Sequence, residues 1–150
     1  MKEILKTSNN MGGLLKMWVV PANRYWLTKT VFAFQNPDEV YQIYCTPGTI
    51  QLKEPLSVND TGRIYKTEVS GFIPENRKEV ADAILEMDGK PFVVLLLDGN
   101  GKYILVGTSF YPLRINPSLE QGKDTADLAG TYISFEGITI ARSIIVDNPF

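Results

Sequence analysis

Residues 92–107 read FVVLLLDGNGKYILVG, and this stretch decides the fold. The run from Phe92 to Leu97 is continuously apolar, which is typical of a strand buried on both faces. Residues 98–101 follow with two residue pairs that tolerate positive φ, and residues 102–107 return as a second strand. We therefore predict a β-hairpin, with one face against a helix and the other toward a barrel interior.

The segment before this hairpin is the one stretch with helical periodicity. Apolar side chains recur at i, i+3, i+4 and i+7, at Val80, Ala83, Ile84 and Met87. Asn76 and Glu79 have the spacing of a capping box, and Gly89 stands where a left-handed C-terminal cap belongs. The pattern predicts a helix over about residues 76–88. Because it is only about three turns long, it must dock its apolar stripe on the sheet.

Strand signals dominate the rest of the chain. We expect loops at 54–62 and 116–126, turns at 21–23, 47–48 and 136–137, and further strands at 16–20, 24–34, 40–46, 49–53, 63–73, 109–115, 130–135 and 138–146. About eight to ten short strands with a single helix favour a mainly β (α+β) fold. The prediction is a single β-rich domain over residues 1–150, an antiparallel β-sandwich or barrel with one flanking α-helix.

Composition excludes several classes of protein. The 150 residues include no histidine and one cysteine, Cys45, so an internal disulfide and a cysteine-based metal cluster are impossible. The net charge of −2 is too small for a nucleic-acid footprint. It is unevenly spread, at +4 over residues 1–36, −5 over 37–88 and −1 over 89–150. No signal peptide and no transmembrane segment are expected, which favours a cytoplasmic or virion location.

The sequence predicts no catalytic, cofactor-binding or metal-binding residues. Cys45 lies in an alternating strand and lacks a histidine base, so we interpret it as a core residue. Residues 98–102 resemble the start of a calcium loop, but the segments on both sides of them are expected to be strands, which favours a hairpin turn. The helical carboxylates Glu79, Asp82 and Glu86 are interpreted as a solvated face.

The aromatic-rich first half of the chain offers two interpretations. Trp18, Tyr25, Trp26, Phe32 and Phe34, with Arg24 and Lys29 among them, have the composition of a stacking platform for bases or sugars. Aromatic side chains in strands are more often core or interface anchors, which we favour. The predicted assembly surface accordingly consists of Trp18, Tyr25, Trp26, Ile50, Leu52 and Leu56.

Two features carry a family resemblance. The first is the order of helix, apolar strand, tight turn and strand over residues 76–107, and the second is the segment DLAGTYISFEG at residues 127–137. Over roughly residues 72–140 the chain resembles bacteriophage or prophage tail structural proteins of the tail-tube and tail-completion kind. The resemblance implies a β-barrel or sandwich flanked by a helix, assembled into rings that stack around passing DNA, with no catalytic residues. The sequence departs from that pattern in having no obvious extended stacking arm, although residues 47–62 are a segment that could serve as one.

We therefore expect a non-enzymatic structural protein that self-assembles through sheet edges and apolar strand faces. Its expected partners are copies of itself in a ring or other virion-type proteins, with no cofactor, no membrane and no sequence-specific nucleic-acid binding. Heterologous contacts between copies can close into such a ring. Two alternatives stay open. One is a β-barrel that binds a small molecule in an apolar interior, and the other is an enzyme that uses carboxylates with Lys or Tyr.

Overall fold

The computed structural model describes residues 13–60, 62–74, 77–120 and 130–150. Within these residues the secondary structure consists of β1 (Leu14–Pro21), β2 (Tyr25–Thr28), β3 (Val31–Phe34), a 3-10 turn (Pro37–Glu39), β4 (Tyr41–Ile43), β5 (Gln51–Lys53), β6 (Leu56–Asn59), β7 (Gly62–Pro74), α1 (Lys78–Met87), β8 (Phe92–Asp98), β9 (Tyr103–Val106), β10 (Arg114–Glu120), β11 (Gly130–Thr139) and β12 (Ile144–Val146).

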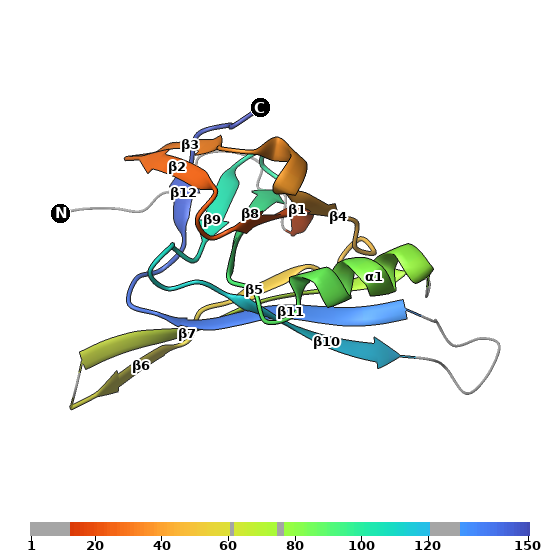
Figure 1. Cartoon of the computed structure of the whole chain (residues 1–150). Helices are drawn as coiled ribbons and strands as arrows, with labels where there is room; N and C mark the ends of the chain where they lie inside the picture. The colour runs from red at the N-terminus through yellow and green to blue at the C-terminus, as the bar shows by residue number, and fades with distance from the viewer. Residues whose placement is uncertain (1–12, 61, 75–76, 121–129) are drawn as a thin grey trace.

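Two antiparallel sheets pack face to face (Figure 1). The first has the strand order β12-β9-β8-β1-β4, and the second has the order β10-β11-β7-β5, with β6 also paired to β7. A separate hairpin, β2-β3, lies over the first sheet. The prediction of a mainly β fold with antiparallel sheets and one α-helix is confirmed. Of the two architectures left open, the structure is a sandwich and not a closed barrel.

The predicted central hairpin is confirmed as β8 and β9. All five side chains from Phe92 to Leu96 are at most 2% exposed. Asp98 forms the turn, because its Oδ1 accepts the backbone N–H groups of Asn100 at 2.9 Å and Lys102 at 2.8 Å, and Gly101 takes a φ of 79°. These two hydrogen bonds fix the direction in which β9 returns along β8.

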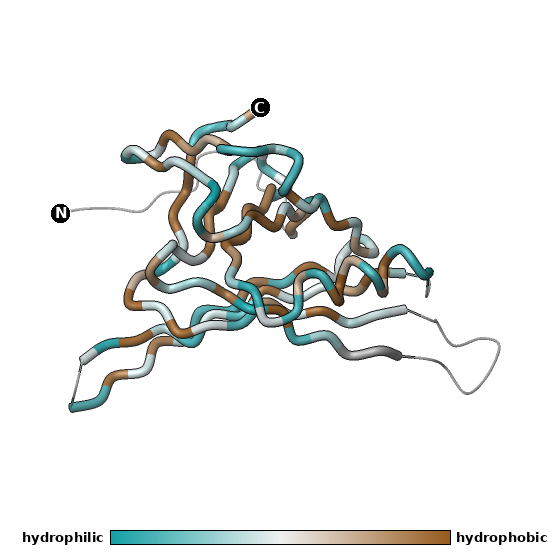
Figure 2. Tube along the Cα trace, viewed as in Figure 1, coloured by the Kyte–Doolittle hydropathy of each residue, from teal (hydrophilic) through white to brown (hydrophobic). Residues whose placement is uncertain are grey.

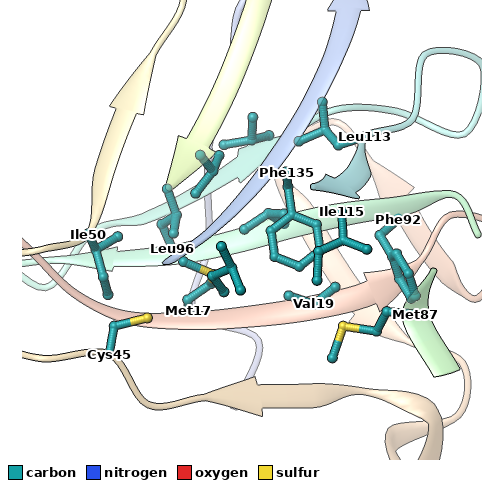
Figure 3. Close-up of a cluster of buried hydrophobic side chains, with 14 of the residues drawn as sticks. Met17, Val19, Cys45, Ile50, Met87, Phe92, Leu96, Leu113, Ile115 and Phe135 are labelled. Carbon is teal, nitrogen blue, oxygen red and sulfur yellow. The ribbon is translucent and has the colours of Figure 1, made fainter. Parts of the chain in front are cut away.

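The two faces of this hairpin are covered differently from our expectation. Alternate residues of β1 and β8, such as Val19 and Leu96, pack against Phe135 of the second sheet in the main core (Figure 3). The intervening residues face the β2-β3 hairpin in a second core cluster. The C-terminal tail also docks there, with the Phe150 ring 5.0 Å from that of Trp18. The outer face of the first sheet is therefore covered by a hairpin and the C-terminal tail rather than by a helix or a barrel interior.

Helix α1 lies over the second sheet beside β4, and its last residue, Met87, belongs to the main core (Figures 1 and 3). Gly89 follows with a φ of 74°, so the predicted left-handed cap is confirmed. The expected N-cap was wrong, because Arg77 occupies that position with extended backbone and forms no side-chain cap hydrogen bond. Asn76 lies outside the described residues.

Several boundaries differ from the sequence prediction. The expected strand at 138–146 is divided between the end of β11 and β12. The expected strand at 24–34 folds into β2 and β3, because Lys29 adopts a φ of 57° and turns the chain. Part of the expected loop at 54–62 is β6, which pairs with the unusually long β7. The expected turn at 136–137 is absent, since β11 continues through Gly137. A Cβ there would lie 2.6 Å from the carbonyl oxygen of Pro112, so this glycine permits close packing rather than a turn.

The segment after the central hairpin also differs. The expected strand at 109–115 begins only at Arg114, and it then runs on to Glu120 through residues that were predicted to form a loop. Pro117 is tolerated there because β10 is the edge strand of its sheet. The second sheet therefore extends well past the point at which the sequence signals end.

Candidate assembly surface

An apolar groove of about 280 Å³ lies where β11 turns into β12. Side chains from three separate parts of the chain line it, and the exposed apolar members are Leu27, Phe110, Tyr111, Ile140 and Ile144. A contiguous group of exposed apolar side chains is characteristic of an interaction site in a soluble protein. The groove is therefore the strongest candidate for an interface in the described part of the chain.

Phe110 is 90% exposed because a hydrogen-bonded turn holds it there. The Tyr111 N–H donates to Thr108 Oγ1 at 3.0 Å, and the Thr108 N–H donates to the Tyr111 carbonyl at 3.2 Å. On the opposite side of the turn, the Ser109 hydroxyl donates to the Ala22 carbonyl at 2.6 Å. A rigidly presented aromatic side chain loses little conformational entropy on binding, so Phe110 is suited to act as an anchor.

A two-stranded arm extends beside the groove. Pairing of β11 with β7 ends at Tyr65, whereas β6 continues to pair with β7 as far as Gly62. Leu56 and Val58 on β6 are 43% and 67% exposed, and Figure 2 shows hydrophobic residues along the arm. An isolated two-stranded ribbon is marginally stable in water, so contact with another surface would stabilise this arm.

Two part-buried hydrogen bonds link the segment just before the arm to the segment beside the groove. Glu54, just before β6, accepts hydrogen bonds from the Ser143 backbone N–H at 2.7 Å and from its hydroxyl at 2.9 Å. Ser143 precedes β12, the edge strand of the first sheet, whose Ile145 is 57% exposed. We call the groove residues together with Leu56, Val58 and the edge of β12 the end surface.

The residues predicted to form the assembly surface differ in their exposure, and they do not lie together. Trp26 and Leu56 are exposed, at 61% and 43%, and only Leu56 belongs to the end surface. Tyr25 and Leu52 are half-buried. Trp18 and Ile50 are buried at 7% and 8% exposure, so the expectation that these two lie on a surface is corrected. Trp18 is covered by the tail and Ile50 by the opposing sheet.

The aromatic cluster is a core and not a stacking platform. Tyr25 stacks on Phe32 with ring centroids 5.5 Å apart, and Phe32 meets Phe34 edge-on at 5.1 Å. Phe34 in turn lies 5.5 Å from Phe150. These rings pack on one another, as expected of a core, whereas Trp26 lies outside this cluster and is 61% exposed.

Cys45 is buried, as its interpretation as a core residue predicts. Burial raises the pKa of the Cys45 thiol to about 11, so the nucleophilic thiolate is scarce at neutral pH. Glu79, Asp82 and Glu86 are exposed, as expected. In the part of the chain that the structure describes, no three His, Cys, Asp or Glu side chains are grouped so that they could hold a metal ion.

Sequence reasoning missed the residues that matter most in the end surface. Phe110 lies between a glycine and a proline in the segment Gly107 to Pro112, and such a lone aromatic residue in a turn is a weak signal. Ile140 of the groove alternates with Ile138 as core residues do, yet it is 58% exposed. Its exposure follows from its position one residue beyond the end of β11, which the alternation does not encode.

No family model, curated protein or solved structure matches this chain. Among the described residues, no helix has the length and apolar character needed to cross a bilayer. The geometry of the end surface is therefore the main indication of what this chain does.

Proposed function

We propose that this chain is a non-enzymatic structural protein that assembles with copies of itself through the end surface. The observation that carries the proposal is Phe110, which a hydrogen-bonded turn holds 90% exposed beside the exposed Ile140 and Ile144. Water contact with so much ordered apolar surface is unfavourable, and its burial against a partner is a general driving force for association.

A second copy of the chain is the proposed occupant, because within the described residues the first sheet ends on each side in a strand that pairs with one neighbour only. β12 forms one edge, next to the groove, and β4 forms the other. Pairing of β12 in one copy with β4 in the next would continue the sheet from subunit to subunit. Such a contact is heterologous, so it closes into a ring when the rotation between copies permits. The opposite charges of residues 1–36 and 37–88 favour attraction between copies.

The proposed setting is a bacteriophage or prophage tail, as a component of a tube or neck. The sequence resemblance supports this setting, and the projecting β6-β7 arm coincides in part with the segment that could serve as a stacking arm. The mechanism is geometric, since shape and apolar complementarity between copies do the work. DNA enters only as passing cargo, and no cofactor takes part.

Light scattering coupled to size-exclusion chromatography tests the proposal across a concentration series. The wild-type chain should form an oligomer of defined mass, and rings should be visible by electron microscopy. Phe110→Asp should raise the dissociation constant by about thirtyfold or more, because loss of a central aromatic anchor costs roughly 2 kcal/mol or more. This side chain contributes little to the fold of one chain, so the variant should keep the wild-type circular dichroism spectrum, and its Tm should fall only by the amount that association adds to the wild type.

Leu85→Asp is the matched control, since Leu85 is 73% exposed on α1, away from the end surface. This variant should associate as the wild type does. A wild-type chain that stays monomeric at every concentration would overturn the proposal. Equal weakening by Phe110→Asp and Leu85→Asp would show that association is nonspecific and would overturn the assignment of the end surface.

A further inference from the structure

A second hollow, of about 260 Å³, lies between α1, β4 and the second sheet. It is on the side of the molecule away from the β6-β7 arm (Figure 1). Aliphatic side chains from all three elements form its inner wall, among them Ile43, Ile73, Ala83, Ile84, Ile115 and Ile133. Its polar groups come from Tyr41, Gln42, Tyr44, Arg77 and Glu79, which also line it.

The hollow exists because the sandwich covers the apolar stripe of α1 only in part. Of the four stripe residues, Met87 alone is buried, and Val80, Ala83 and Ile84 are half-buried. Ala83 has the smallest side chain of the four and stands in the middle of the stripe, where a larger residue would reach the opposing sheet. The helix is therefore fully covered only at Met87, whereas Val80, Ala83 and Ile84 pack against the main core and also line the hollow.

Two hydrogen bonds keep the helix in this position. Tyr41 on β4 donates its hydroxyl to Glu86 Oε2 at 3.0 Å, and the Arg114 guanidinium donates to the Gly89 carbonyl at 2.7 Å. Burial, together with the neighbouring Glu86 carboxylate, raises the pKa of Tyr41, so this hydroxyl stays protonated as a donor. Because both bonds are at the C-terminal end, the helix cannot move into the hollow without breaking them.

We propose that this hollow binds a small, largely apolar molecule of about ten non-hydrogen atoms. A cavity of about 150 Å³ lined by aliphatic and aromatic side chains accommodates benzene, so this volume suits a fused pair of rings. The inner wall consists of aliphatic side chains, so a polar or charged ligand group placed against it would lose its water without gaining a hydrogen-bond partner. Such a ligand would place any polar atom toward Gln42 and Glu79. This inference does not rest on self-assembly.

Indole is a suitable probe, because it is a fused two-ring molecule with one polar N–H. It should be titrated into the protein while the isoleucine methyl groups are followed by NMR spectroscopy. The expected result is saturable binding, with shifts concentrated at Ile84, Ile115 and Ile133. Shifts concentrated at Ile140 and Ile144 would place the probe in the end surface and overturn the proposal. The absence of any shift up to the solubility limit of indole would overturn it as well.

A pair of matched variants on α1 sharpens the test. Ala83→Leu fills the hollow, whereas Ala81→Leu makes the same change at an exposed position of the same helix. Ala83→Leu should weaken indole binding by about tenfold or more, because the larger side chain occupies the volume of the ligand. Ala81→Leu should leave the affinity within about twofold. Equal affinities for both variants would overturn the proposal, and if Ala83→Leu does not fold, the wild-type methyl shifts decide alone.

Ligand binding in the hollow and self-association through the end surface can be tested independently. Repeating the titration with Phe110→Asp, in which association is weakened, should give the wild-type affinity and the same isoleucine shifts. A probe that binds only the associated wild-type chain would show that the hollow is formed or completed between copies, which would contradict a site built within one chain.

Discussion

Gly71→Ala should be strongly destabilising, and Cys45→Ala should remove most of the effect. A Cβ at Gly71 would lie 2.6 Å from Cys45 Sγ, whereas ordinary contacts between carbon atoms begin at about 3.5 Å. The two segments cannot easily separate, because the Thr46 N–H donates to the Phe72 carbonyl at 2.8 Å. An overlap of about 1 Å in a packed core should cost about 2–3 kcal/mol, at the upper end for overpacking.

Cys45→Ala alone should cost about 1 kcal/mol, the scale of losing one buried heavy atom. With the sulfur removed, the nearest atom to the added Cβ is the Cβ of residue 45 at 3.4 Å, which is an acceptable contact. In this background Gly71→Ala should be close to neutral, since alanine also lowers the entropy of the unfolded chain. The double-mutant cycle should therefore give a coupling energy of about 2 kcal/mol.

Urea unfolding of the four chains measures this coupling from the midpoints and slopes. In thermal scans Gly71→Ala should lower Tm by about 4–8 °C or more relative to the wild type, for a chain of this size. Independent sites add to within about 0.5 kcal/mol, so a coupling energy below that value would refute the argument. It would mean that β7 and the Cys45 segment are farther apart than the structure places them.

Three further predictions concern stability. Burial raises the pKa of the Cys45 thiol from 9.0 to about 11. The contribution of the protonated thiol to the unfolding free energy is therefore fully present below pH 9 and should fall by about 2–3 kcal/mol as the pH rises to 11. Urea midpoints should show this dependence on pH in the wild type and not in Cys45→Ala. Thr139→Val should cost about 1–2 kcal/mol, because it leaves the buried Thr67 hydroxyl, 3.1 Å from Thr139 Oγ1, without that partner. Thr67→Val added to it should restore part of the loss, and a purely additive result in urea unfolding would contradict this. Asp98→Ala should lower the unfolding free energy by about 1 kcal/mol, since two backbone N–H groups lose their acceptor. Asp98→Asn should lower it less, because its amide oxygen can still accept these bonds. An equal loss in both variants would count against the turn geometry.

The elements that could be predicted from the sequence are those with a complete local signal. The central hairpin combines a continuous apolar run with turn residues, and α1 combines a 3.6-residue period with a glycine cap, so both were identified with small errors at their ends. Gly137 shows the limit of such reasoning. A glycine in a strand and a glycine in a turn look alike in sequence, and only the carbonyl of Pro112 from another segment distinguishes them.

The candidate site was less predictable than the fold. Alternation indicates which side chains of a strand share a face, but not whether another layer covers that face. Trp18 and Ile50 are covered by the C-terminal tail and the opposing sheet, which are distant in sequence. Phe110 is exposed because hydrogen bonds to Thr108 and Ala22 hold its turn outward. Each outcome depends on contacts between segments far apart in the chain.

The three apolar surfaces discussed above differ in how much of each is covered by other parts of the chain. This difference also determines what each surface could bind. The β2-β3 hairpin and the C-terminal tail cover the outer face of the first sheet, so that face needs no partner. The stripe of α1 is half covered and leaves a hollow the size of a small molecule. The end surface has no cover in the described chain and presents an anchor, a sheet edge and an arm together. A partner with an extended surface of its own would be needed to bury all three, and the proposed second copy would offer β4, the other edge strand of the first sheet in the described residues.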